Sequence, residues 1–207
     1  MPEETSGQQP TWGDHSILVE VREPGAWRVV ASSELYDPFG SHFLMIIPHP
    51  DANHIALWAA AGQDGQCLFG ATRTASALKL ERVADLSICG IPSFNRSGDQ
   101  FLIVADYNEL RQYQFPNGRL LAKMRWPFDD MHNQIGDEVL FVDQTRALLP
   151  STADKLYLVD LAMMAIVDEV SFSGLNGNAR LHQLPDGRIL SVHRTGLTDT
   201  ILTWRMS

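Results

Sequence analysis

Two histidines and an aspartate in one short segment are the residues of this sequence best suited to holding a metal ion. His49 and His54 stand on either side of Asp51 in the segment PHPDANH. Imidazole and carboxylate groups bind zinc, but a zinc site needs a third or fourth ligand. The two prolines and the asparagine favour a turn over a helix that presents both histidines on one face. We therefore predict a turn here and no metal site.

A pair of carboxylates near a histidine is the next candidate. Asp129 and Asp130 precede His132. Calcium takes roughly six to eight oxygen ligands, often from a D-x-D-x-D-G loop, and that pattern does not occur. The stretch from Pro127 to Asp137 is the longest connection between expected repeats, and long surface loops carry binding residues. We interpret it as a solvated loop that contacts a partner, and we predict no metal and no cofactor.

Side chains that perform nucleophilic catalysis are present without a catalytic pattern. Ser32 and Ser33 are adjacent, yet the sequence contains no G-x-S-x-G turn, no G-x-G-x-x-G loop and no P-loop. Cys67 and Cys89 lie in apolar runs, where a thiol is normally inert packing. Two cysteines are also too few for a disulfide framework, so we interpret them as reduced, buried thiols. No catalytic residue is predicted, and whether the chain is an enzyme stays open.

One enzymatic alternative is a metal-dependent hydrolase or lactonase of propeller fold, with a divalent ion in the central channel. Such a site needs acidic and asparagine residues at the ends of the inner strands. The candidates are Glu34, Asp106, Asn133 and Asp143, and they do not recur in phase along the chain. This alternative therefore ranks below a non-enzymatic function.

The acidic composition and the short apolar runs exclude several classes of protein. The 207 residues carry a net charge of −9, and the 16 Lys and Arg residues are scattered singly, which disfavours phosphate backbones. No apolar stretch approaches the roughly 18 residues that a membrane helix needs. Residues 1–14 are polar and acidic, unlike a secretory signal. We expect a cytoplasmic protein that binds neither nucleic acid nor membranes.

A repeat with a period near 45 residues organises the chain. Four apolar runs each follow a pair of turn residues, and these pairs are Asp64-Gly65, Asn108-Glu109, Asp154-Lys155 and Asp199-Thr200. The pairs are 44, 46 and 45 residues apart. Further short apolar runs and turns keep the same phase. This period matches one four-stranded blade of a β-propeller.

The phase of the repeat predicts the domain organisation. Residues 1–14 form a polar tail, and 15–207 form a single all-β, β-propeller-like domain. Its approximate repeats are 15–33, 41–84, 89–127, 137–172 and 179–206. We predict about four blades of four antiparallel strands, with the N-terminal strands paired in the last blade, because closure removes an exposed sheet edge. An open array completed by another copy is the alternative, since four blades leave one strand in surplus.

The third strand of each expected blade resembles the corresponding strand of WD-repeat propellers. The likeness lies in YLVDL (157–161), RQYQF (111–115) and LTWRM (202–206), and NGRLL (117–121) resembles the start of the following strand. No Trp-Asp or Gly-His dipeptide occurs, so the family's buried Asp–His network does not carry over. The resemblance implies a rigid ring whose loops and faces bind partners.

The repeat, together with the lack of a catalytic pattern, favours a non-enzymatic scaffold that binds another protein. The expected contacts are residues of loops and irregular segments, namely Trp12, Phe39, Asp129, Asp130 and His132. The alternatives are the metal-dependent hydrolase or lactonase, and an incomplete propeller that assembles with another copy or chain. A homo-oligomer is compatible with each of these functions.

Overall fold

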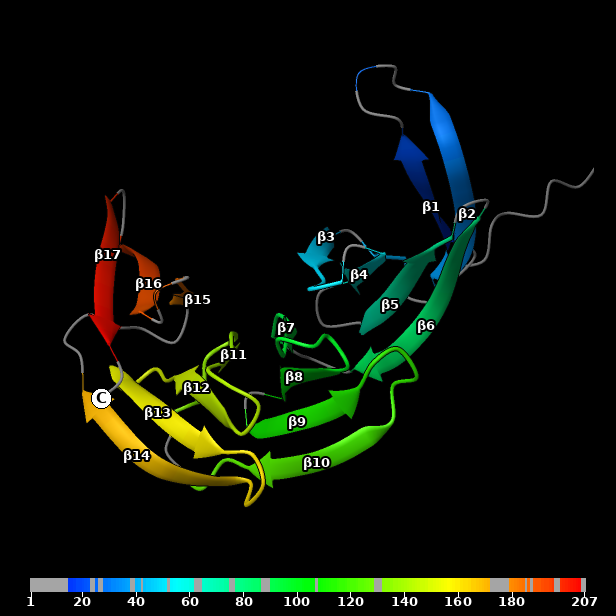
Figure 1. Ribbon diagram of the computed structural model, residues 1–207. Helices are drawn as coiled ribbons and strands as arrows, with labels where there is room; N and C mark the ends of the chain where they lie inside the picture. Colours follow the sequence, from blue (N-terminus) through cyan, green and yellow to red (C-terminus); the bar gives the residue numbers. More distant parts are fainter. Residues whose placement is uncertain are drawn as a thin grey trace, which may run out of the picture.

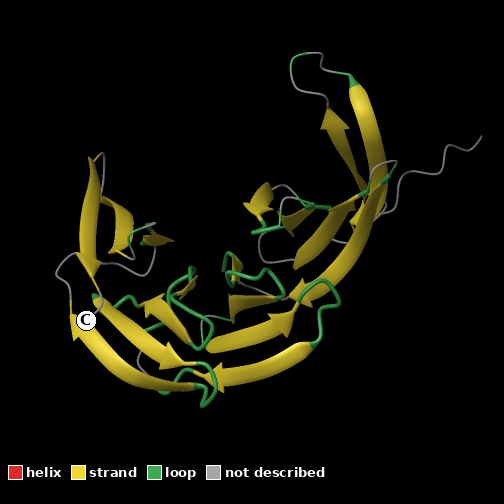
Figure 2. Ribbon diagram, viewed as in Figure 1, coloured by secondary structure: helices red, strands yellow, loops and turns green. Residues whose placement is uncertain are grey.

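Strands are the regular elements of this protein, as Figure 2 shows. The computed structural model describes residues 15–22, 25, 28–37, 40–41, 43–51, 53–61, 65–74, 77–86, 90–106, 108–128, 132–171, 179–184, 186, 188–195 and 198–205. Within these ranges there is no helix of the length and hydropathy required to cross a membrane.

The strands form five antiparallel sheets in chain order. The first sheet is a hairpin of β1 (His15–Arg22) and β2 (Val29–Asp37). Three four-stranded sheets follow. The second sheet consists of β3 (Phe43–Pro48), β4 (His54–Ala60), β5 (Gln66–Arg73) and β6 (Leu78–Leu86), and the third consists of β7 (Ser93–Phe94), β8 (Gln100–Ala105), β9 (Glu109–Gln114) and β10 (Leu120–Arg125). The fourth consists of β11 (Leu140–Phe141), β12 (Arg146–Pro150), β13 (Lys155–Asp160) and β14 (Ala165–Ser171). The last sheet has three strands, β15 (Arg180–Gln183), β16 (Arg188–Thr195) and β17 (Thr198–Arg205).

The sheets stand side by side like the blades of a propeller and form an open arc (Figure 1). The strands β3, β7, β11 and β15 line the inside of the arc, while β6, β10 and β14 lie on its outside. Each four-stranded sheet runs from the inside outward in chain order. The all-β fold with blades of four antiparallel strands, predicted from the period, is confirmed.

Burial along the strands follows from stacking of the sheets. In β5, six consecutive residues are buried, and in β8 five are, because each of these strands has a sheet on both faces. The outer strand β14 is exposed along most of its length. Its sequence, AIVDEVS, is correspondingly mixed rather than uniformly apolar.

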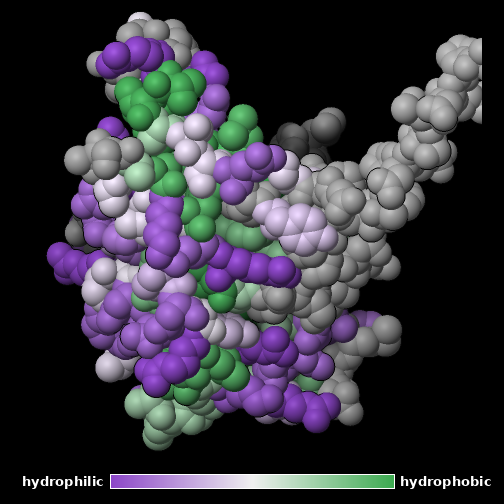
Figure 3. Space-filling view, turned by 90° about the vertical axis from the view of Figure 1, so that its right-hand side faces the viewer, coloured by the Kyte–Doolittle hydropathy of each residue, from purple (hydrophilic) through white to green (hydrophobic). Residues whose placement is uncertain are grey.

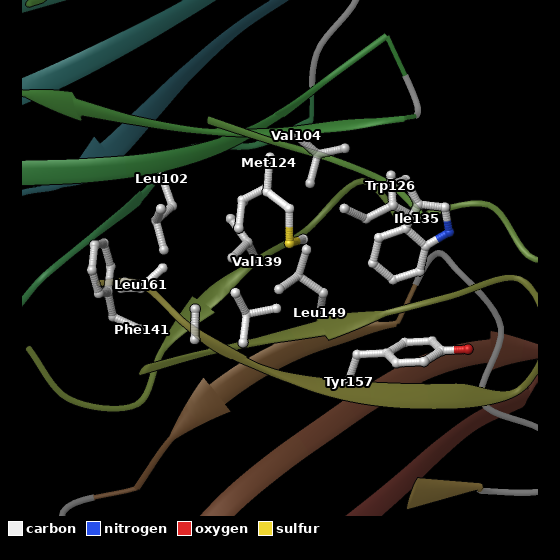
Figure 4. Packing of buried hydrophobic residues seen from close by; sticks show 13 residues of the cluster. Leu102, Val104, Met124, Trp126, Ile135, Val139, Phe141, Leu149, Tyr157 and Leu161 are labelled. Carbon is white, nitrogen blue, oxygen red and sulfur yellow. The ribbon is translucent and has the colours of Figure 1, made fainter. Parts of the chain in front are cut away.

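The core is a series of apolar clusters between neighbouring sheets. The largest lies between the sheets β7–β10 and β11–β14, where Leu102 and Val104 of β8 meet Leu149 of β12 and Tyr157 of β13 (Figure 4). Each of these side chains is fully buried. Burial of one such aliphatic side chain contributes about 1.5–3 kcal/mol, so these interfaces hold the array together.

The prediction that the N-terminal strands pair in the last blade is wrong. The strand β1 pairs with β2, and the last sheet consists of β15, β16 and β17 alone among the described residues. The hairpin packs instead on the sheet β3–β6, where Ile17 and Val19 contact a cluster that contains Leu57 and Phe69. The short connection from β2 to β3 keeps the hairpin beside that sheet, and burial of these apolar side chains fixes it there.

Candidate functional site

Most of the predicted contact residues lie outside the described part of the chain. This holds for Trp12, Phe39, Asp129 and Asp130. His132 is described and exposed, at the start of the segment that leads into β11. The residues on both sides of 129–131 are therefore the part of the predicted loop that the structure defines.

The connection between β10 and β11 is anchored to the core by a small polar network. The indole N–H of Trp126 donates a hydrogen bond to the backbone oxygen of Asn133, at 2.7 Å. The side-chain amide of Asn133 donates to the hydroxyl of Tyr157, at 3.0 Å. The rings of Trp126 and Tyr157 meet edge to face, with centroids 4.9 Å apart. These contacts hold the connection at Trp126, before the residues 129–131, and at Asn133, after them.

Thr152, in the turn between β12 and β13, holds the same connection from the neighbouring sheet. Its hydroxyl donates to the backbone oxygen of His132 at 3.0 Å and accepts from the backbone N–H of Gln134 at 2.9 Å. Phe128 packs on the two aromatic rings of the network, yet 38% of its surface stays exposed. The connection thus presents an exposed aromatic and an exposed imidazole on a rigid base. Such a pair suits contact with another molecule.

Two adjacent acids in this connection, Asp137 and Glu138, were not among the predicted site residues. One carboxylate oxygen of Glu138 accepts from the backbone N–H of Leu181 at 3.2 Å, and the other lies 3.6 Å from the guanidinium of Arg180. Burial raises the pKa of both acids, and the charge of Asp137 adds to the rise at Glu138. Glu138 therefore ties the β10–β11 connection to the last sheet.

The segment with His49, Asp51 and His54 is a turn between β3 and β4, as predicted. His49 accepts the backbone N–H of Asp51 at Nδ1, at 3.0 Å, and its Nε2–H donates to the backbone oxygen of Gly98, at 2.8 Å. His54 Nδ1 lies 3.0 Å from a carboxylate oxygen of Asp51. Phe115 packs against both rings. The histidines are thus engaged in the turn and in a contact with the next sheet.

Hydrogen bonds between the turns that follow the inner strands recur from sheet to sheet. Each joins a side chain of one turn or strand end to the turn of a neighbouring sheet. The pairs are His49 with Gly98 at 2.8 Å, Asn95 with Gln144 at 3.2 Å and Gln183 with Val142 at 3.2 Å. These bonds link four consecutive sheets and stiffen the array.

An aspartate also recurs in these turns. Asp51, Asp143 and Asp186 each accept the backbone N–H of the residue two positions later, at 2.9, 2.8 and 3.1 Å. This bond to Asn53 holds the pKa of Asp51 below its ordinary value. Burial alone would raise the pKa of Asp143, but hydrogen bonds from Thr145 and Arg146 keep it low. These carboxylates stabilise turns.

The candidates for a channel metal site are spread over different elements. Glu34 lies on β2 and bonds to Ser16, and Asp106 follows β8. Asn133 bonds to Tyr157, and Asp143 closes its own turn. Across the described residues, no group of three or more His, Cys, Asp or Glu side chains is arranged to hold a metal ion.

The serines and cysteines that were considered as nucleophiles, and not favoured as such, are placed only in part. Cys67 is buried within β5, as predicted, whereas Cys89 lies outside the described residues. Ser32 and Ser33 lie on β2, opposite Glu20 and Val19 of β1.

Comparison with known proteins supports the fold alone. No family model matches the chain, and no curated protein matches it. Among solved structures, the chain is similar to TolB from Acinetobacter baumannii, with a TM-score of 0.58 and 19% sequence identity over 84% of this chain. The match spans 43% of the TolB chain, so this chain corresponds to less than half of that protein. The likeness shows a β-propeller-like fold and does not single out the WD-repeat family.

Proposed function

We propose that this chain is a non-enzymatic propeller module that binds another protein, and that the β10–β11 connection makes the contact. The observation that carries the proposal is the exposure of Phe128 and His132 on an anchored base. Trp126 and Tyr157 hold that base in place. Aromatic side chains on rigid supports contribute a large share of binding energy at protein interfaces, because little conformational entropy is lost when they bind.

The carboxylates in the turns stabilise the fold. Hydrogen bonds within their own turns hold the pKa values of Asp51, Asp99 and Asp143 below the ordinary value. The period near 45 and the sequences of the third strands support kinship with WD-repeat propellers, which is part of the proposal.

An incomplete propeller that assembles with another copy or chain is the second candidate function. The strand count of the sheets favours it. The described sheets hold two, four, four, four and three strands in chain order. The arc stays open between the first and the last of them (Figure 1). Because blades need neighbours on both faces, the ends of such an array are sites for assembly.

The proposed function is tested by isolating a partner with the immobilised full chain and then measuring its affinity for variants. Phe128→Ala and His132→Ala should each weaken binding about tenfold, which corresponds to about 1.4 kcal/mol. Val167→Ala is the matched control, because Val167 is also exposed but lies on the outer strand β14. A partner that binds all three variants equally well would exclude the β10–β11 connection as the contact.

A further inference from the structure

The inner strand β3 carries an apolar face that the rest of the chain leaves uncovered. Leu44 and Ile46 are 58% and 66% exposed. They pair across the sheet with Ala59 and Leu57 of β4, which are both buried. The four side chains share one face of the sheet, because cross-strand partners point to the same side.

The β1–β2 hairpin covers the outer part of that face. Ile17 and Val19 of β1 pack against the cluster of Leu57, Cys67 and Phe69. The strand β2 lies beside β6. The hairpin therefore occupies the position of the two outer strands of a blade, and the region over β3 is left open.

In the following three sheets the corresponding inner residues are partly or wholly covered. Phe94 of β7 packs on the sheet β3–β6, against a cluster that includes Met45 and Ile47. Phe141 of β11 and Leu181 of β15 are both 5% exposed and belong to the clusters shared with the sheets before them. In each sheet the cover comes in part from inner strands of the preceding sheet. The sheet before β3 is the hairpin, which lacks such strands.

The strand β1 also offers a backbone edge at the same place. Within the described residues β1 pairs only with β2, so its second edge has no partner strand. Because β2 lies beside β6 and β1 packs over β4 and β5, that edge faces the position above β3. Backbone N–H and C=O groups on such an edge pair readily with an added strand.

We infer that the edge of β1 and the face of Leu44 and Ile46 form a docking site for a β-hairpin from a different polypeptide chain. The hairpin supplies two antiparallel strands with apolar side chains on one face, and it completes the blade that β1 and β2 begin. The interface continues the existing contact of Ile17 and Val19 with β4 and β5. The inference rests on the second candidate function and is independent of the β10–β11 connection.

Two other occupants fit the site less well. Residues 1–14 contain two prolines and one large aromatic, Trp12, and thus lack the apolar alternation of a strand. A second copy would present the open face of its last sheet, where Arg180 and His182 lie opposite Val192 and Leu190 and are exposed. Arg180 keeps its ion pair with Glu138, but placing the His182 imidazole against Leu44 and Ile46 would bury a polar group in an apolar contact.

The test uses a cyclised synthetic peptide with the sequence of residues 137–151, which spans the β11–β12 hairpin. In the chain, Leu140 and Leu148 of this hairpin pack on the last sheet, so the peptide carries the required apolar face. Binding of the labelled peptide to the full chain is followed by fluorescence anisotropy. Ile46→Glu is expected to weaken binding at least tenfold. The equally exposed Met163→Glu, in the turn after β13, is expected to leave it unchanged.

Four outcomes overturn the inference. The peptide fails to bind, or Ile46→Glu binds it as tightly as the wild type. Trp12→Ala creates binding that the wild type lacks, which assigns the site to residues 1–14. Light scattering shows a dimer that Ile46→Glu dissociates, which assigns it to a second copy. The Phe128→Ala variant should bind the peptide as the wild type does. A loss of peptide binding at β1 and β3 is therefore distinguishable from a loss of partner binding at the β10–β11 connection.

Discussion

The side-chain amide of Asn133 donates a hydrogen bond to the hydroxyl of Tyr157, 24 residues away in the sequence and 3.0 Å away in space. This bond ties the β10–β11 connection to the next sheet. Tyr157 is fully buried, and its ring packs against the rings of Trp126 and Phe128. The Tyr157 hydroxyl is thus one of the buried contacts that position the proposed binding residues, beside those of Trp126 and Thr152.

Tyr157→Phe should lower the free energy of unfolding by about 1 kcal/mol, because the amide of Asn133 loses its hydrogen-bond partner while the ring packing stays. Urea denaturation measures the change. Tyr36→Phe is the control, since Tyr36 is exposed on β2 and its change should stay within about 0.5 kcal/mol. Equal effects of the two substitutions would show that the network contributes nothing.

Gly98→Ala should destabilise the protein through the contact with His49. Gly98 has a φ of +78°, and a Cβ at this position would overlap the His49 ring. Gly25 has a nearly identical φ of +81°, but a Cβ there meets nothing within 4 Å. Gly25→Ala thus reports the backbone strain alone, about 1 kcal/mol. Thermal denaturation should show the larger loss for Gly98→Ala, and a matching loss in both variants would contradict the packing argument.

The pKa shifts of Glu138 and Asp143 predict opposite dependences of stability on pH. Burial raises the pKa of Glu138, so its contribution is present at low pH and is lost as pH rises through the raised value. The pKa of Asp143 is lowered, so its contribution is present above its ordinary pKa of 3.8 and is lost as pH falls through the lowered value.

The urea concentrations at the unfolding midpoint, measured between pH 2 and pH 7, test the direction in which each acid changes stability with pH. The wild type should lose stability relative to Glu138→Gln as pH rises, because the glutamine keeps an acceptor for Leu181 and cannot ionise. Relative to Asp143→Asn, the wild type should gain stability as pH rises, because only the ionised aspartate pairs with Arg146. A difference that stays constant with pH in either variant speaks against the assigned cause.

The repeat could be predicted from the sequence because its signals are local. The turn pairs Asn108-Glu109 and Asp154-Lys155 stand at the starts of β9 and β13, where a tight reversal precedes an apolar run. Strand type and approximate position depend on such short patterns. The same reasoning identified the turn that contains His49 and His54.

The neighbours of a strand are decided by packing that the local sequence does not contain. The pattern of β1 predicts a strand, but burial of Ile17 and Val19 on the sheet β3–β6 determines where that strand lies. Closure with the last sheet was therefore predicted wrongly. Glu138 was missed for a related reason, since its hydrogen-bond donor, Leu181, is 43 residues away. Its only local signal is an acid directly before an apolar run in the longest connection.

The array of blades is open between its first and last sheets (Figure 1). Hydrophobic side chains gather at the tip of the β1–β2 hairpin among hydrophilic ones (Figure 3). Val30, which is exposed near this tip, offers one site for a spin label. The second label is placed either at Lys79 on the adjacent β6 or at Thr203 on β17, both of which are exposed.

Pulsed electron-paramagnetic-resonance distances between nitroxide-bearing amino acids at these sites measure the opening. In an open array the pair at Val30 and Lys79 gives the shorter distance, since β2 and β6 are neighbours. The pair at Val30 and Thr203 then gives a clearly longer distance, because β2 and β17 lie on opposite sides of the opening of the arc (Figure 1). A Val30–Thr203 distance as short as the Val30–Lys79 distance would mean that the ring is closed, and the open array would be wrong.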